Sequence, residues 1–535
     1  MHPRHTPPLP PNPVNLNPQP TPFSFQFSPF GFPMNILFLL CCLPLLLADS
    51  AQTIPLRQRL GGTADPLQVY QTILRAHQEA DSAGTTVSYE GIDTLRLAIP
   101  PDAQSIPLQP FNDFGGAVFI VTNNARNLHL FASAPPARTL PIADTALLCR
   151  AIDSGDFRNI EPLSHGHWLL NVVDSTPWVD QRRGYAYGHY RQDILRIHDG
   201  TSADRPAAPY SDGESRPHIL ARQLDSLDPG LFFGNITLLR DSASTRATYL
   251  VRLENLPSAT LQNITVSTPR SNILSANDAI ITIYNSTQIL IDSISLWGTY
   301  SRPNHSGYGF LLNNLRHTRI RKIKTISDWG IFGTNNMTDT RFEHSHFNRF
   351  DIHCYGRDVL FDHCLLRDGF NQFSSLFGTL TFRNCTFDNF TPIYIENSYN
   401  ASTHFLVRVD SCVWWPTSQH RYFFHGGSID APVNRRKELA TTSLPSFEIQ
   451  GLAIRTSRGV QEIEFLHLSG NERIANTHGG LEKLTLKEVS LDGDDRTKII
   501  LCNKKIRLTS TAFPSVGPEV LDIERKAIRQ SKKQK

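Results

Sequence analysis

Eight stretches of the chain repeat one pattern of apolar and polar positions. In each, an apolar residue is followed two places on by a polar or small residue, at once by an apolar residue, and by another apolar residue two places further. The stretches are FFGNITL (232–238), TLQNITV (260–266), LIDSISL (290–296), LFDHCLL (360–366), TFRNCTF (381–387), RVDSCVW (408–414), EIQGLAI (448–454) and TLKEVSL (485–491). Alternation predicts half-buried strands, and the break in it predicts a corner between two of them.

The polar residue at each break suits a corner, because Asn, Ser and Gly tolerate unusual backbone angles or bond their own backbone. The corner column reads Asn235, Asn263, Ser293, His363, Asn384, Ser411, Gly451 and Glu488, and Lys322 and His344 fit it less well. With these two included, the corners from Asn235 to Ser411 lie 28, 30, 29, 22, 19, 21 and 27 residues apart. Such spacing indicates one coil of a solenoid per repeat.

We therefore predict an all-β fold, a right-handed parallel β-helix (solenoid) whose coils stack at the strand spacing of about 4.8 Å. Like residues should then stack in inward columns. Cys364, Cys385 and Cys412 share one such column, and we interpret them as buried thiols that act as small hydrophobes. A disulfide between in-register neighbours on adjacent parallel strands would be strained.

The other segments do not follow the repeat. A proline-rich start precedes an apolar run from Met34, which we take as the true start, and small residues follow; this predicts a leader and a signal peptide. DPLQVYQTILRAHQEADSAG (65–84) is apolar on one side only, which predicts a helix that caps the open edge of the first coil. The predicted organisation is a leader over 1–33, a signal peptide over 34–51, an N-terminal cap and first coils over 52–138, an inserted β-rich segment over 139–230, the parallel β-helix over 231–500, and a C-terminal cap with a basic tail over 501–535.

Charge, hydropathy and cysteine spacing limit the kinds of binding partner that the chain is expected to have. The 52 Lys and Arg residues nearly balance the 49 Asp and Glu residues, so nothing indicates a nucleic-acid partner. The apolar run is short and broken by proline, which predicts no membrane span in the mature chain. The cysteines form no CxxC pair, so neither a zinc ribbon nor a thioredoxin-like motif is indicated. We expect a secreted, periplasmic or cell-surface protein that is monomeric and binds a polysaccharide or other glycan.

Six phrases, together with the repeat, carry a family resemblance. They are DFGGAVFIVTNN (113–124), GTYSRPNHSGYGFLLNN (298–314), WGIFGTNN (329–336), NRFDIHCYGRDV (348–359), NQFSSLFGTLTF (371–382) and IENSYNA (395–401). Over most of residues 60–415 the chain resembles the pectate-lyase-like β-helix superfamily and, more closely, a group of secreted β-helix proteins of Bacteroidales bacteria whose activity is unassigned. The superfamily resemblance implies polysaccharide lyases and glycosidases, but also non-catalytic adhesins and phage fibres.

The densest group of chemically capable side chains lies in FNRFDIHCYGRDVLFDHC (347–364). If the apolar residues that alternate with them fill the core, Asp351 and His353 project outward from one strand face, and Tyr355 and Arg357 continue the line. A carboxylate or His can move a proton, Arg neutralises a uronate carboxylate, and Tyr stacks on a sugar or acts as an acid. These four residues are the candidate catalytic set.

Coil stacking brings polar residues of neighbouring coils beside this set, so that a carbohydrate groove would cross the strands. The candidate substrate-binding residues are Asp328, Trp329, Asn335, Asn371, Gln372, Glu396, Asn397 and Tyr399.

Two functions of different class follow. The first is a secreted carbohydrate-active β-helix protein, a polysaccharide lyase or glycoside hydrolase acting on an acidic or complex glycan. The alternative is a non-catalytic surface or periplasmic solenoid that binds glycans in the manner of an adhesin. Neither the carboxylate group with a basic residue of calcium-dependent lyases nor the closely spaced Asp residues of polygalacturonase-like hydrolases is readable here. The sequence thus leaves open whether the protein is an enzyme and whether it needs a cofactor, for which a divalent metal such as calcium is one option.

Overall fold

The computed structural model describes residues 53–174, 180–181, 188–189, 191–225, 228, 230–267, 279–297, 301–302, 305–306, 308–326, 332–352, 355–373, 376–395, 404–426, 445–456, 460, 462–468, 484–492, 498–502 and 511–516. All of them belong to one of the chain's two compact units, Gln52–Lys535; the other is Met1–Ala51. The predicted leader and signal peptide lie outside the described residues.

The N-terminal part of this unit forms a helical cap. Its elements are β1 (Thr53–Pro55), α2 (Leu56–Leu60), α3 (Pro66–Ala83) and β2 (Thr86–Ser88). Helix α3 begins where the Asp65 side chain accepts the Leu67 N–H, and it ends at Gly84, whose φ of 63° suits a glycine. One side of α3 is buried against the first strands of the main sheet, including Tyr70, Ile73 and His77. The predicted capping helix is confirmed.

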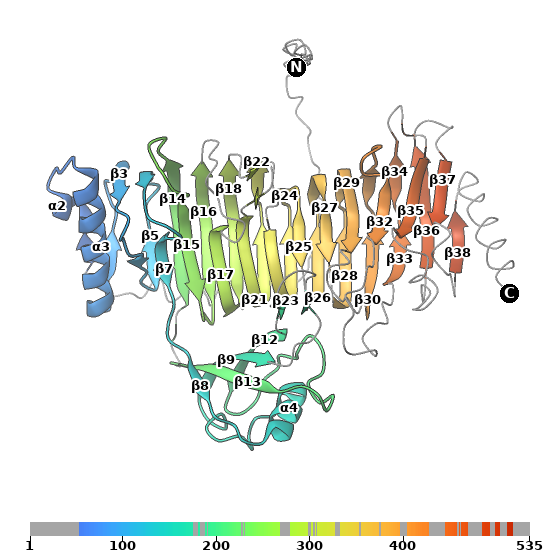
Figure 1. Cartoon of the computed structure of the whole chain (residues 1–535), viewed down its shortest axis with the longest axis horizontal. Helices are drawn as coiled ribbons and strands as arrows, with labels where there is room; N and C mark the ends of the chain where they lie inside the picture. The colour runs from blue at the N-terminus through green and yellow to red at the C-terminus, as the bar shows by residue number, and fades with distance from the viewer. Residues whose placement is uncertain are drawn as a thin grey trace, which may run out of the picture. The chain divides into compact units, whose positions relative to one another are not determined.

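In the described part of the chain, twenty-eight strands form the main sheet, and every strand pairing within it is parallel. They are β3 (Thr94–Ile99), β4 (Ile106–Pro107), β5 (Phe111–Asp113), β6 (Val118–Asn123), β7 (His129–Ser133), β14 (Leu231–Arg240), β15 (Tyr249–Glu254), β16 (Ala259–Ser267), β17 (Ala279–Thr287), β18 (Ile289–Trp297), β21 (Tyr308–Arg321), β22 (Lys324–Ile326), β23 (Phe332–Glu343), β24 (His346–Phe347), β25 (Phe350–Ile352), β26 (Arg357–Asp362), β27 (Leu365–Phe373), β28 (Phe377–Arg383), β29 (Thr386–Ile395), β30 (His404–Asp410), β31 (Val413–Trp415), β32 (Tyr422–Gly426), β33 (Ser446–Gln450), β34 (Ala453–Arg455), β35 (Glu462–Leu468), β36 (Leu484–Asp492), β37 (Lys498–Cys502) and β38 (Thr511–Val516). A strand pairs with the strand one coil later, as β14 does with β16 and β16 with β18. The fold is the predicted parallel β-helix (Figure 1), with the right-handed sense that connections between parallel strands nearly always follow.

The predicted corner column is confirmed by backbone angles. All ten of its residues, Lys322 and His344 included, adopt left-handed φ values, from 47° at His344 to 64° at Gly451. The strand register places them one above another: Gly234 pairs with Gln262 before the first two corners, and Ile236 pairs with Ile264 after them. The Asn263 Nδ2 donates to Asn235 Oδ1 at 2.9 Å, so the corner side chains also bond along the column.

Like residues stack inside the coils. Phe342, Phe361 and Phe382 lie ring over ring with centroids 4.8 and 5.0 Å apart. Cys364 and Cys385, like Cys412 on the next coil, are buried free thiols, and burial raises the pKa of the Cys385 thiol well above its usual value. The interpretation of these cysteines as small hydrophobes is confirmed.

A separate β-rich insert leaves the β-helix after β7 and returns before β14. It holds β8 (Arg138–Leu140), α4 (Thr145–Ser154), β9 (His167–Asp174), β10 (Asp180–Gln181), β11 (Gly188–His189), β12 (Arg191–His198) and β13 (Pro217–Leu224). Four of its strands form an antiparallel sheet in the order β12-β9-β13-β8, with its own hydrophobic core. A further short pair, β19 (Ser301–Arg302) and β20 (His305–Ser306), lies outside the main sheet. The predicted inserted β-rich segment is confirmed.

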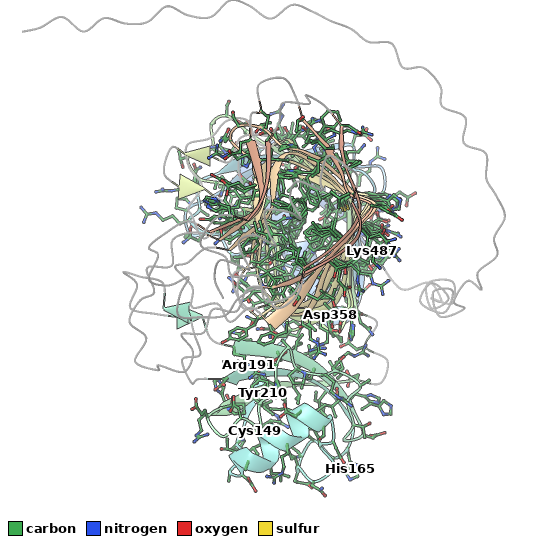
Figure 2. All side chains as sticks on the ribbon, turned by 90° about the vertical axis from the view of Figure 1, so that its right-hand side faces the viewer. Cys149, His165, Arg191, Tyr210, Asp358 and Lys487 are labelled. Carbon is green, nitrogen blue, oxygen red and sulfur yellow. The ribbon has the colours of Figure 1, made fainter. Side chains whose placement is uncertain are left out.

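Buried polar contacts fix the insert against the coils of β21 and β23, beside the row of strands (Figure 1). Arg316, only 2% exposed, donates to the carbonyl oxygens of Ile194 at 2.8 Å and Arg205 at 2.6 Å. Its guanidinium also lies 3.6 Å from the buried Asp193 carboxylate. Within the insert, the Arg191 guanidinium lies 3.6 Å from the centre of the Tyr210 ring (Figure 2). The insert therefore covers one face of these coils.

Candidate functional site

Five side chains on the non-core face of successive coils stand in register and form a row across the β-helix; the first two are buried and the last three are half-buried. The register pairs Asp351 of β25 with Gln372 of β27, Gln372 with Tyr394 of β29, Tyr394 with His425 of β32, and His425 with His467 of β35. We call Asp351, Gln372, Tyr394, His425 and His467 the polar row. Because paired strands lie about 4.8 Å apart, the row spans about 19 Å from its first to its last member.

The first end of the row is a hydrogen-bonded network around Asp351, whose side chain is fully buried. Arg349 Nε donates to Asp351 Oδ1 at 2.8 Å, and Arg349 Nη2 donates to Gln372 Oε1 at 3.0 Å. The Tyr308 hydroxyl donates to Asp351 Oδ2 at 3.3 Å. The ring of Tyr308 lies over Gly333, where a Cβ atom would come within 2.9 Å of it. Glycine at this position lets the tyrosine reach the carboxylate.

Aromatic rings continue the row. The Arg349 guanidinium lies 4.9 Å from the centre of the Phe370 ring, which meets the Tyr394 ring edge-on at 5.1 Å. The Tyr394 ring in turn meets the His425 ring edge-on at 5.2 Å. All three rings are half-buried. They form an aromatic surface in the middle of the row.

The far end of the row is a group that we call the histidine cluster: Tyr422, His425, Glu464 and His467. The Tyr422 and His467 rings stack at 4.0 Å, and the His425 ring lies 5.2 Å from that of His467. Glu464 Oε2 is 2.7 Å from His467 Nδ1. Arg421 Nη2 donates to the Tyr422 hydroxyl at 3.0 Å. Burial, together with the neighbouring His467, lowers the pKa of His425 to about 4, so this imidazole is neutral at physiological pH.

In both strands of the histidine cluster, β32 and β35, the alternation of inward and outward side chains is interrupted. Each of the two strands turns two consecutive apolar residues into the core, Phe423–Phe424 in β32 and Phe465–Leu466 in β35. The polar residues on either side of each pair are therefore three apart in sequence and both face outward. The register then places Tyr422 beside Glu464 and His425 beside His467.

The structure brings together two of the residues expected from sequence, Asp351 and Gln372, and it joins them through Arg349. The apolar neighbours of Asp351, Phe350 and Ile352, are fully buried in the core as expected. The expected outward placement of Asn371 is wrong. It stands in the column of Phe350 and is fully buried, where its Nδ2 donates to the Pro392 carbonyl oxygen at 3.1 Å.

The expected outward line from Asp351 to Arg357 is also wrong in its second half. Tyr355 has a φ of 55° and is 3% exposed. This left-handed residue turns the chain, so alternation does not continue past it. Arg357 lies toward the insert, where its Nη1 donates to the Pro206 carbonyl oxygen at 2.9 Å, and its Nε donates to Asp358 at 3.2 Å. Neither residue stands in the polar row.

The remaining expected residues divide into two groups. Asn335 is half-buried on β23, paired with Asn313 and two positions beyond Gly333, which pairs with Asp351. The rest lie outside the described residues: His353, Asp328, Trp329, Glu396, Asn397 and Tyr399.

Sequence reasoning missed most of the site, namely Arg349, Phe370, Tyr394, Tyr422, His425, Glu464 and His467. One signal was present. The tetrapeptides Tyr-Phe-Phe-His (422–425) and Glu-Phe-Leu-His (464–467) share the order polar, apolar, apolar, histidine. Repetition of that order in two coils of a solenoid indicates a second kind of corner with paired outward residues.

The described residues also bear on metal binding and on membrane-spanning helices. Among them, no three His, Cys, Asp or Glu side chains gather in a way that would hold a metal ion. None of the helices they form is both long enough and apolar enough to cross a membrane.

Comparison with known proteins identifies no family: no family model matches the chain, and no curated protein matches it. Among solved structures, the tailspike of Pseudomonas phage phi297 is similar at 9% identity and a TM-score of 0.48, covering 87% of this chain and 81% of that one. A tailspike of Acinetobacter baumannii bacteriophage AP22, solved with a capsular saccharide, is similar at 10% identity and a TM-score of 0.43, covering 86% and 79%. The A-module of the mannuronan C-5 epimerase AlgE6 of Azotobacter vinelandii is similar at 8% identity and a TM-score of 0.32, covering 86% and 100%.

Proposed function

We propose that this chain is a secreted carbohydrate-active β-helix protein that binds an acidic or complex polysaccharide across the polar row. The observation that carries the proposal is the row itself, in which the half-buried rings of Tyr394, His425 and His467 continue the buried hydrogen-bonded pair Asp351 and Gln372 across five successive coils. Aromatic rings present apolar faces beside polar edges, as the two faces of a sugar ring require. The half-buried members, from Tyr394 to His467, span two coil steps or about 10 Å, which accommodates a short stretch of an extended sugar chain.

Charge along the row favours a glycan with carboxylate groups. Arg349 lies at one end, where Asp351 and Gln372 already accept from its Nε and Nη2. Arg421 lies at the other end, and a guanidinium binds a carboxylate through charge-assisted hydrogen bonds. Both are also held in place by neighbours, Arg349 by Asp351 and Arg421 by Tyr422. A preordered side chain loses less entropy when it binds.

The alternative, a non-catalytic adhesin-like solenoid, has its own support in the first end of the row. Both oxygens of the Asp351 carboxylate accept hydrogen bonds and its side chain is fully buried. A buried carboxylate so engaged holds its neighbours Arg349 and Tyr308 in place rather than transferring protons. Secretion to the cell surface or periplasm, a monomeric state and the closer relation to Bacteroidales β-helix proteins are part of the same proposal.

Affinity electrophoresis in gels that contain polygalacturonate, alginate or neutral dextran tests the proposal. We expect the protein to be retarded by at least one uronate polymer, and Tyr394→Ala to abolish the retardation while the far-UV spectrum stays unchanged. Trp415→Ala is the control, since Trp415 is an exposed aromatic residue, 39% exposed, outside the row. Equal loss in both variants, or no retardation of the unmodified chain by any of the three, contradicts the proposal.

A further inference from the structure

One end of the insert carries two histidines that face each other across neighbouring strands. His167 begins β9 and His198 ends β12, and the antiparallel register pairs them directly. The His198 N–H donates to the Thr201 carbonyl oxygen at 2.8 Å, so it points away from β9. The two histidines therefore form a non-hydrogen-bonded pair, the kind in which cross-strand side chains lie closest together. Figure 2 shows the nearby His165 at the end of the insert away from the coils.

The spacing of the two imidazole rings suits a shared metal ion. Their centres are 4.3 Å apart and their planes meet at 83°. Two imidazoles that bind one ion at right angles, each through a nitrogen about 2.0–2.1 Å from the metal, have ring centres about 4.5 Å apart. The rings of His167 and His198 thus already lie at nearly the required separation. Right-angled coordination is typical of copper(II), which also has the highest affinity for nitrogen ligands among the divalent ions of its series.

Asp199 places a carboxylate beside this pair. Its Oδ2 lies 3.4 Å from His198 Nδ1, and its Oδ1 accepts the Gly166 N–H at 2.9 Å. The Asp199 N–H in turn donates to the Gly166 carbonyl oxygen at 2.9 Å, which ties the carboxylate to the residue before His167. A carboxylate at one ring nitrogen orients an imidazole and makes its other nitrogen a better metal ligand.

Packing does not account for this arrangement. The side chains of His198 and Asp199 are 70% and 61% exposed, and His167 is half-buried. Exposed polar side chains of this kind contribute little to the stability of a fold. An ion at the pair would be reached directly from solvent, and water would complete its coordination.

We propose that His167 and His198 bind one copper(II) ion, with Asp199 orienting the His198 ring. The protein supplies two ligands, not the three or more of a closed protein site, which no group among the described residues provides. The ion joins the first residue of β9 to the last residue of β12, so its binding stabilises the folded insert by mass action. This site is separate from the polar row and does not depend on glycan binding.

Calorimetric titration of the full chain with copper(II) and with zinc tests the proposal. We expect one equivalent of copper(II) to bind at the pair, more tightly than zinc does. Electron paramagnetic resonance of the copper-loaded chain should show two coordinated nitrogens at this site. His167→Gln and His198→Gln should each abolish this binding. His218→Gln is the matched control, because His218 is an exposed histidine of the same sheet that pairs with Val173 and has no histidine opposite it.

Asp199→Asn separates orientation of the ring from a structural role. Asparagine keeps an oxygen for the Gly166 N–H and accepts the φ of 43°, so the metal-free insert should resist proteolysis as the unmodified chain does. The affinity for copper(II) should nevertheless fall roughly 10–100-fold. Copper binding that is unchanged in His167→Gln and in His198→Gln, a single coordinated nitrogen, or tighter binding of zinc overturns the proposal. Equal loss of binding in His218→Gln overturns it too, because the ion would then not belong to this pair.

Discussion

The corner column offers a test of the fold in which the expected sign reverses between neighbouring positions. Asn263 has a φ of 52°, whereas Thr265, two residues on, lies in the regular part of β16. Alanine and glycine are each placed at both positions. At either position the two variants lose the same native side chain, so the comparison between alanine and glycine isolates the backbone.

The magnitudes follow from backbone sterics. A left-handed φ costs a non-glycine L-residue roughly 1–2 kcal/mol, and glycine loses roughly 0.4–1 kcal/mol through the greater freedom of its unfolded chain. Asn263→Ala should therefore be less stable than Asn263→Gly by about 1 kcal/mol. In the strand the order reverses, and Thr265→Ala should be more stable than Thr265→Gly by roughly 0.5–1 kcal/mol in the free energy of unfolding.

Urea unfolding of the full chain followed by far-UV circular dichroism gives the free-energy differences from the shift in midpoint at a common slope. Both Asn263 variants lose the hydrogen bond from Asn263 to Asn235, so its contribution to stability cancels in the difference between them. If Asn263→Ala is as stable as Asn263→Gly or more stable, the corner does not hold a left-handed residue in solution and the coil reasoning is refuted.

Two further predictions concern buried ionisable groups. Burial lowers the pKa of His77, on the capping helix, to about 4. Because the pKa of an unfolded histidine is about 6.5, the unfolded state binds more protons than the folded state between pH 6.5 and 4. The free energy of unfolding should therefore fall by roughly 3 kcal/mol as the pH is lowered through this window. His77→Gln should flatten this fall in urea midpoints measured across the same pH range, and an unchanged slope would show that His77 is not the group responsible. Arg316→Met removes the cation that bonds the insert and should destabilise it by roughly 3–5 kcal/mol, seen as faster proteolysis between β7 and β14. Arg319→Ala, which breaks an ion pair with Glu343 at a side chain 42% exposed, should cost less than about 1 kcal/mol, and equal effects in the two variants would argue against a docked insert.

The repeat was predictable because its signal is local. Each corner is specified within seven residues by the order of apolar and polar side chains, and Asn384 or Ser411 identifies itself without knowledge of any other coil. The inward cysteines follow from the same alignment. Where the repeat is interrupted, the antiparallel sheet of the insert could be expected only in outline, since nothing in the repeat indicates which of its strands pair.

The polar row was not predictable in this way, because its members share no spacing. Tyr394 follows Gln372 by 22 residues, His425 follows Tyr394 by 31, and His467 follows His425 by 42. Lengthening a connection between strands costs little free energy, whereas shifting a strand by one residue exchanges its two faces. The members of the row therefore stay in register on neighbouring strands, although the number of residues between them varies from coil to coil. The error at Tyr355 has a different cause, because a left-handed tyrosine gives no sign of itself in the sequence.

Stacking in register also limits the charges that a column can hold. Two like charges about 4.8 Å apart repel by about 3 kcal/mol at an effective dielectric constant near 20. In the column just before the corners, signs alternate: Arg321 bonds Asp292 at 2.7 Å and Arg383 bonds Asp362 at 2.5 Å.

One neighbouring pair in this stretch, Glu343 and Asp362, has like sign, and each carboxylate bonds a different arginine. Glu343 bonds Arg319 at 2.7 Å instead, in a column two positions away. His425 and His467 obey the same constraint in the polar row, where their rings lie 5.2 Å apart. Burial keeps His425 neutral, so no charge on its ring opposes the His467 ring that Glu464 holds on the adjacent coil. The geometry of the β-helix thus gives different surroundings to two histidines that the sequence presents as equivalent.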